Sequence, residues 1–204
     1  MFRNSETYMP TYTLIAVNVA VYGYTSILSG SINNTSDWVV SSYGQNNFLV
    51  LNGEAWRLLT AIFIHANLLH IVGNMLFLLI FGLRAEKLFD LKEYLSVYFL
   101  SGLAGGLLTL LMGPDTWSIG ASGAIFGMLG ACTIYARRSI GQSIMYALLY
   151  SFFFLVINIG PDVNVLAHIG GLVTGLLIGY LLAMTRKPQQ TVTYQYNYPS
   201  FYSG

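Results

Sequence analysis

Charged residues are scarce in this chain of 204 residues. They make up 8% of it, whereas hydrophobic residues make up 55% and the mean hydropathy is +0.60. Soluble domains carry about 25% charged residues, because charge is what covers a water-facing surface. The sequence therefore excludes an ordinary soluble domain and indicates an integral membrane protein embedded in a lipid bilayer.

Other absences narrow the function. The single cysteine, Cys132, allows no disulfide within the chain. A net charge of +1 is too small to favour a nucleic-acid partner. The chain has three histidines and no His-Glu-x-x-His motif, so neither a metal ion nor another cofactor is expected.

Long apolar runs, separated by glycine, proline and charge, predict six membrane-spanning helices. A bilayer core about 30 Å thick needs roughly 20 helical residues, and about 17 is the minimum. The runs that meet this length are 11–29, 66–83, 93–112, 120–136, 143–159 and 164–184. The predicted fold is an all-α membrane bundle in one domain, 11–186. It lies between a short cytoplasmic segment, 1–10, and a disordered Tyr/Gln-rich cytoplasmic tail, 187–204.

The basic residues indicate the orientation of this bundle. With six spans, eight of the nine Lys and Arg residues fall on one side, and only Arg57 falls on the other. Because basic residues favour the cytoplasmic side, both termini are predicted to be cytoplasmic, in the cell membrane. Residues 30–65 then form a long outer loop, whose aromatic residues suit the membrane interface.

Strongly polar side chains within membrane spans are costly, and they mark functional sites. In the predicted topology they lie near the outer ends of the second, fourth and sixth helices, at His65, His70, Asn74, Ser122 and His168. His70 and Asn74 are four residues apart and share one helix face. His65 is predicted to point elsewhere, toward the interface.

Small residues repeat at every fourth position in two of the predicted helices. The fourth helix carries Gly123, Gly127 and Ala131, and the sixth carries Gly171, Gly175 and Gly179. Such stripes let helix backbones approach closely within a bilayer. We therefore expect these two helices to pack together and to bring Ser122 to His168.

A serine paired with a histidine predicts nucleophilic catalysis. A serine hydroxyl is a weak nucleophile until a base takes its proton, and His168 is the candidate base. The Asn74 amide, His70 and the free N–H groups at the helix start are candidates to stabilise an oxyanion. Each residue alone also fits ordinary helix packing, so it is their convergence at one depth that favours an enzyme.

The residues around His168 predict a dyad rather than a triad, because no carboxylate is well placed to orient the imidazole. Asn164, four residues earlier, could orient the ring, although capping of the helix is the preferred interpretation. Phe126 lies four residues after Ser122, on the same helix face, and is expected either to pack against the imidazole or to fill the core.

Taken together, these motifs resemble those of the rhomboid intramembrane serine proteases, in their basic six-helix form. The matching segments follow the order of that family: Trp56-Arg57, His65-x4-His70-x3-Asn74, Phe81-Gly82 with Glu86, Gly120-Ala-Ser122-Gly, and Ala167-His168 with Gly171 and Gly175.

The resemblance implies a role for each matching residue. Ser122 would be the nucleophile and His168 the base, with His70, Asn74 and Gly120 around the oxyanion. Trp56 and Arg57 would form a structural motif of the first loop, and Glu86 would stabilise the cytoplasmic end of the second helix. Phe126 falls where some members have a tyrosine stacked on the histidine. The implied activity is hydrolysis of a peptide bond in or near a transmembrane segment of another membrane protein, with the site open to the extracytoplasmic side.

Three other functions compete with this one. A non-catalytic rhomboid-like protein would bind or escort membrane clients. A metal-dependent membrane protease would use His65, His70 and His168 as ligands. A transporter or channel would have a polar site at mid-membrane and would pass solutes.

Overall fold

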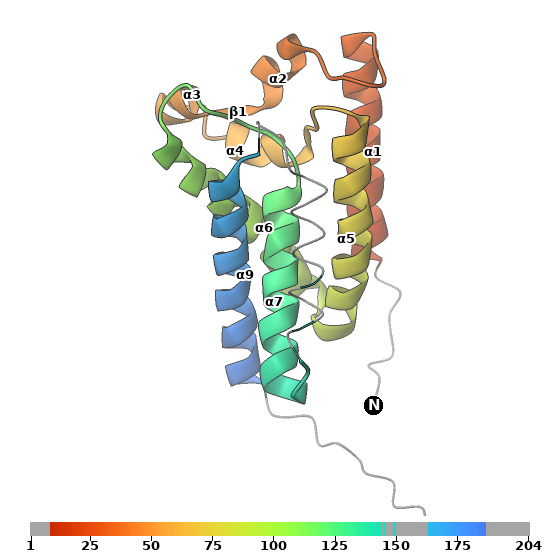
Figure 1. Cartoon of the computed structure of the whole chain (residues 1–204), viewed down its shortest axis with the longest axis vertical. Helices are drawn as coiled ribbons and strands as arrows, with labels where there is room; N and C mark the ends of the chain where they lie inside the picture. The colour runs from red at the N-terminus through yellow and green to blue at the C-terminus, as the bar shows by residue number, and fades with distance from the viewer. Residues whose placement is uncertain (1–8, 144, 146–148, 150–162, 187–204) are drawn as a thin grey trace, which may run out of the picture.

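A computed structural model describes residues 9–143, 145, 149 and 163–186 of the chain (Figure 1). Helices dominate this part, and two short strands interrupt them. The α-helices are α1 (Pro10–Ser29), α2 (Asp37–Tyr43), α3 (Asn47–Leu51), α4 (Arg57–Thr60), α5 (Leu68–Leu88), α6 (Leu91–Thr109), α7 (Ser122–Ile140) and α9 (Val165–Thr185). Two 3-10 turns, Ala61–Phe63 and Leu110–Met112, and the strands β1 (Gln45–Asn46) and β2 (Trp117–Ser118) complete it.

Four helices of the described residues are long and apolar enough to cross a bilayer: α1, α5, α6 with its 3-10 extension, and α9. They coincide with the predicted runs 11–29, 66–83, 93–112 and 164–184. The run 120–136 is also helical, within α7, but its small residues and the pair Arg137-Arg138 make α7 less apolar than the other four. The predicted fifth run, 143–159, lies almost entirely outside the described residues, as do 1–8 and the tail.

Local sequence signals fix where these helices begin. The Asn67 side chain accepts a hydrogen bond from the His70 N–H at 2.8 Å and so caps α5. Asp90 and Glu93 form a reciprocal capping box at the start of α6. The second run was predicted to end at 83, but α5 continues to Leu88, because the charged residues after the apolar stretch remain helical.

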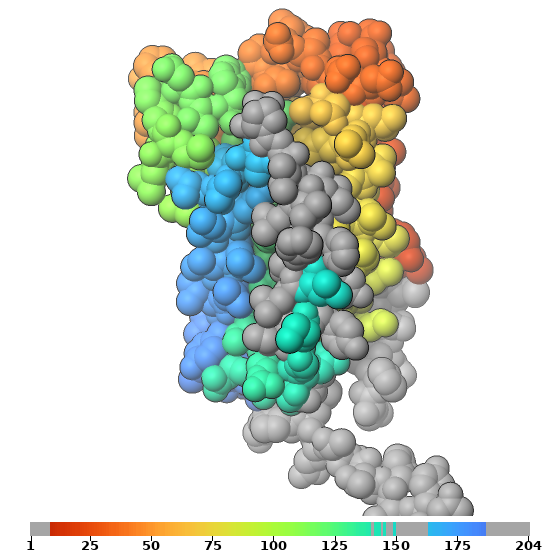
Figure 2. All heavy atoms as spheres, viewed as in Figure 1, coloured from red at the N-terminus to blue at the C-terminus, as the bar shows by residue number. Residues whose placement is uncertain are grey.

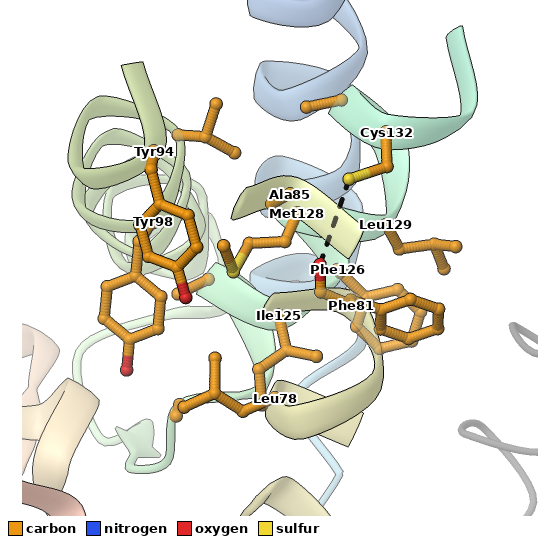
Figure 3. Packing of buried hydrophobic residues seen from close by; sticks show 14 of the residues in the cluster. Leu78, Phe81, Ala85, Tyr94, Tyr98, Ile125, Phe126, Met128, Leu129 and Cys132 are labelled. Atoms are coloured by element: carbon orange, nitrogen blue, oxygen red, sulfur yellow. Dashed lines mark hydrogen bonds between the residues drawn. The ribbon is translucent and has the colours of Figure 1, made fainter. Parts of the chain in front are cut away.

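Helix α7 occupies the middle of the bundle and packs against α5, α6 and α9, while α1 packs mainly against α5 (Figure 1). The core lies between α5, α6 and α7, and its side chains interdigitate there (Figure 3). Its members labelled in the figure are Leu78, Phe81, Ala85, Tyr94, Tyr98, Ile125, Phe126, Met128, Leu129 and Cys132. The packing of α7 against α5 and α6 in this core fixes the position of α7, and with it the position of Ser122.

Residues 30–65 form a folded cap over one end of the bundle rather than an extended loop, as their atoms show in Figure 2, in orange. Strand β1 of this cap pairs antiparallel with β2, in the register Gln45–Ser118 and Asn46–Trp117. The fold is mostly helical, as predicted, and these two strands are a detail that the sequence did not indicate, because strands of two residues are too short for a period-two pattern. The pairing ties the cap to the segment that leads into α7.

Candidate active site

A glycine turn places Ser122 at the first position of α7. Gly120 has a φ of +116°, which glycine adopts without strain, and its N–H donates to the Ala61 carbonyl at 2.8 Å. A Cβ atom at Gly120 would lie 2.8 Å from Nε2 of His70. Both the backbone conformation and the closeness of His70 therefore require glycine here. Within the described residues, no side chain caps α7, which leaves the N–H groups of its first turn available beside Ser122.

His168 lies in the first turn of α9 and meets Ser122 directly. Its Nε2 atom is 2.8 Å from Oγ of Ser122, within hydrogen-bonding distance, and both residues are buried. The Phe126 ring packs against the imidazole, with the ring centroids 4.6 Å apart and the planes tilted by 33°. Two side chains 46 positions apart in sequence thus form one contact, and Phe126 both packs against the imidazole and belongs to the hydrophobic core.

Small residues make this contact between α7 and α9 possible. A Cβ atom at Gly171 would lie 2.0 Å from the carbonyl oxygen of Gly123, and one at Gly175 would lie 1.9 Å from that of Gly127. One turn further along, Gly179 faces Ala131, where the corresponding distance is 2.4 Å. The predicted pairing of the two stripes is therefore confirmed, turn by turn, and it sets the helix separation at the level of Ser122.

His70 and Asn74 lie on α5, one turn apart, but only His70 lines the cavity in front of Ser122. The Asn74 side chain is fully buried, and its Nδ2 group donates to the His70 carbonyl at 2.9 Å. Among the described residues, Oδ1 of Asn74 has no hydrogen-bond partner. The carboxamide therefore lies directly beneath His70 in the helix rather than on the cavity wall.

His65 does not point toward the interface, so the prediction for its direction is wrong. The ring is fully buried and meets the ring of His70 edge-on, with the centroids 5.1 Å apart. The prediction judged the direction of His65 by helical spacing from His70, whereas α5 begins only at Leu68 and His65 precedes the helix. Burial, together with the neighbouring His70, lowers the pKa of His65 to about 3.

A cavity of about 860 Å³ opens in front of the Ser122–His168 pair. Its walls come from the cap, α5, α6, the segment around β2, and α9, and Asp37 is the one acidic residue among those that line it. Within the described part of the chain, no three His, Cys, Asp or Glu side chains lie close enough to hold a metal ion. Ser122 and His168 share the walls of this cavity with the His70 ring.

Arg57 organises the cap from within. Its side chain is buried, donates to the carbonyls of Ser41 and Gly44 at 2.9 and 2.8 Å, and pairs with Glu54 at 2.7 Å. The guanidinium also lies 4.6 Å from the centre of the Trp56 ring. These contacts fit the structural role that the resemblance implies for Trp56 and Arg57.

Glu86 connects the far ends of two helices. One of its carboxylate oxygens accepts a hydrogen bond from the Thr11 N–H at 2.9 Å, in the first turn of α1. An acidic group beside the start of a helix satisfies a free N–H group and suits the helix dipole. The contact fits the predicted stabilising role of Glu86 at this end of α5.

Asn164 caps α9, as preferred from the sequence, because its Oδ1 accepts from the Ala167 N–H at 2.9 Å. Sequence reasoning missed two further amides near the site, those of Gln45 and Asn47. Both are buried in the cap and donate to backbone carbonyls of α6 and the loop after it. Isolated amides in a polar loop carry no periodic signal, so only the fold reveals them.

A family model described as "Rhomboid domain" matches residues 52–185 of this chain. This chain belongs to the rhomboid family. The matched range contains Ser122, His168, His70, Asn74 and Gly120. The family and the apolar helices together make this rhomboid protein an integral membrane protein.

Several relatives carry the family name. Rhomboid protease GluP of Bacillus subtilis is 32% identical over 195 residues, which cover 91% of this chain and 37% of that protein. YdcA of Bacillus subtilis is 31% identical, over 91% of this chain and 96% of that protein. RHOMBOID-like protein 6, mitochondrial, of Arabidopsis thaliana is 39% identical, over 67% of this chain and 46% of that protein. This rhomboid chain thus spans less than half the length of GluP and of that plant relative.

Proposed function

We propose that this rhomboid protein is an intramembrane serine endopeptidase. It hydrolyses a peptide bond in or near a transmembrane segment of another membrane protein, through a dyad of Ser122 and His168. The observation that carries the proposal is the 2.8 Å contact between Nε2 of His168 and Oγ of Ser122, at the wall of a cavity. The protease names of related chains support the same reaction class.

The mechanism follows from this contact. His168 accepts the Ser122 proton while Oγ attacks the substrate carbonyl, and it then donates that proton to the leaving amine. Water next attacks the acyl-enzyme, with His168 again as the base. Phe126 holds the plane of the imidazole through both steps.

The negative charge on the attacked oxygen needs donors that are already in place, each worth about 2.7–4 kcal/mol in known oxyanion holes. The N–H groups at the start of α7 and the His70 ring border the cavity beside Ser122. Gly120 keeps the turn open next to His70. We assign Asn74 to this group as well, as a residue that positions His70: its amide donates to the His70 carbonyl from one turn below the ring.

The topology proposed with this function has six spans, both termini in the cytoplasm and the cavity on the extracytoplasmic side. The helices α5, α7 and α9 all begin at the capped end of the bundle (Figure 1), which brings His70, Ser122 and His168 to one level. A substrate helix hides its carbonyls in its own hydrogen bonds, so a substrate must unwind locally before Ser122 reaches it.

The test uses the purified full-length protein in detergent, with a fluorogenic transmembrane substrate. Ser122→Ala and His168→Ala should each abolish cleavage, and a serine-reactive fluorophosphonate should label the wild type at Ser122. Ser101→Ala is a matched control, since this buried serine of α6 has no hydrogen-bond partner within the described residues. Cleavage that survives in both dyad variants would refute the mechanism. A wild type that binds membrane proteins without cleaving or labelling would favour the non-catalytic alternative.

A further inference from the structure

The Asn164 side chain makes more hydrogen bonds than a helix cap needs. Its Oδ1 accepts from the Ala167 N–H, which is the cap itself. Its Nδ2 group donates to Oγ1 of Thr109 at 2.7 Å and to Oγ of Ser118 at 2.8 Å. One carboxamide therefore joins three separate segments: the start of α9, the end of α6 and β2.

Two of these segments lead directly to the reacting groups. Asn164 lies four residues before His168, and Ser118 lies four residues before Ser122. The hydrogen bond between Asn164 and Ser118 thus spans the two chain segments just before the base and the nucleophile. Its length limits how far the start of α9 can move from the turn that presents Ser122.

The third partner anchors this link to the rest of the fold. Thr109 is fully buried, its hydroxyl donates to the Gly105 carbonyl at 2.9 Å, and its carbonyl accepts from Asn47 at 2.8 Å. Asn47 in turn accepts from the Gln45 amide at 3.0 Å. A network in which buried polar groups are satisfied is rigid, and it fixes the groups attached to it.

We propose that Asn164 is a positioning residue for the Ser122–His168 pair, a role that rests on the proposed function. The cap alone needs an acceptor oxygen, which serine also provides. The two amide donor bonds serve a different purpose, since they set the distance between base and nucleophile. Loss of those bonds lets α9 and the Ser122 turn shift, and a misplacement of 1 Å costs up to about a hundredfold in rate.

Asn164→Ser separates the two roles, because it keeps a capping oxygen and removes both amide donors. We expect kcat to fall about tenfold to a hundredfold, with KM and the unfolding temperature near those of the wild type. Labelling of Ser122 by a fluorophosphonate should slow by a similar factor, since it needs the same dyad and no substrate binding. Asn46→Ser is the matched control: Asn46 caps α3 through its Oδ1, and its amide group donates no hydrogen bond within the described residues. Its kcat should stay at the wild-type value.

A double-mutant cycle then tests the link itself. Ser118→Ala should lower kcat less than Asn164→Ser, and the double variant should match Asn164→Ser alone, because both remove the same bond. Wild-type kcat in Asn164→Ser, or fully additive effects in the double variant, would overturn the positioning role. If Asn164→Ser unfolds, Ser118→Ala alone decides. A kcat of Ser118→Ala equal to that of the wild type would then overturn the positioning role of Asn164. A wild type that fluorophosphonate does not label would instead refute the proposed function.

Discussion

Gly171→Ala tests whether the close approach of α7 and α9 is what assembles the site. A Cβ atom at Gly171 would lie 2.0 Å from the Gly123 carbonyl oxygen, whereas ordinary contact begins at 3.4 Å. The obstacle is backbone, which no side-chain rotation relieves. The two helices must therefore separate locally by about 1.4 Å (3.4 minus 2.0), at a cost of about 1–3 kcal/mol for overpacking.

This separation acts directly on the dyad, because Gly171 is one turn from His168 and Gly123 adjoins Ser122. The Nε2–Oγ distance of 2.8 Å would grow to about 4 Å, beyond hydrogen-bonding range. We expect kcat to fall about a hundredfold, together with a lower unfolding temperature. Gly179→Ala meets backbone at 2.4 Å, but two turns further from the dyad, and should reduce stability more than activity.

Gly23→Ala on α1 is the control, since nothing lies within 4 Å of a Cβ atom there. It should leave the rate unchanged and stabilise the helix by about 0.5–1 kcal/mol. Turnover of the transmembrane substrate and thermal unfolding in detergent measure both quantities on the same samples. If Gly171→Ala keeps the wild-type rate and unfolding temperature, the helices do not approach as closely as described, and the reasoning fails.

Three further predictions concern residues around the dyad. Asn74→Ala should lower kcat about tenfold or more and change KM little, because its amide positions His70 for the transition state; a kcat equal to the wild type in steady-state kinetics would remove that role. Arg57→Lys should lower the unfolding temperature, since lysine cannot make the three directed contacts to Glu54 and the cap carbonyls at once. His65 stays neutral in the fold, with a pKa of about 3 against 6.5 when unfolded, so its contribution to stability is complete above pH 6.5 and declines as the pH falls toward 3. The loss amounts to about 2 kcal/mol at pH 5, and unfolding curves of His65→Phe should lack that part of the pH dependence.

The sequence by itself predicted the membrane class and four runs that the structure shows as helices long and apolar enough to cross a bilayer. The scarcity of charge and the long apolar runs were enough to predict both the membrane class and these helices. The reason is that a chain crossing a bilayer must satisfy its backbone hydrogen bonds internally, which leaves few possible structures. The glycine stripes predicted the contact between α7 and α9, since small residues at every fourth position have one clear use in lipid. Ser122 and His168 stood out because polar side chains are rare at that depth.

The sequence failed where local pattern carries no information. It placed His65 toward the interface, although the chain turns before α5 and buries that ring against His70. It missed the pairing of β1 with β2, which is too short for a periodic signal. It also gave no hint that Asn164 joins Thr109 and Ser118, since contacts between distant segments depend on how the whole chain packs.

Residue spacing along a helix thus determined which faces meet, because periodicity is a local property of the chain. The tertiary structure alone decided the 2.8 Å distance between Ser122 and His168 and the network that surrounds it. That distance depends on helix separation, on the turn at Gly120 and on the cap, none of which a single segment specifies. Distances between segments are properties of packing, and packing is settled only when all segments are in place.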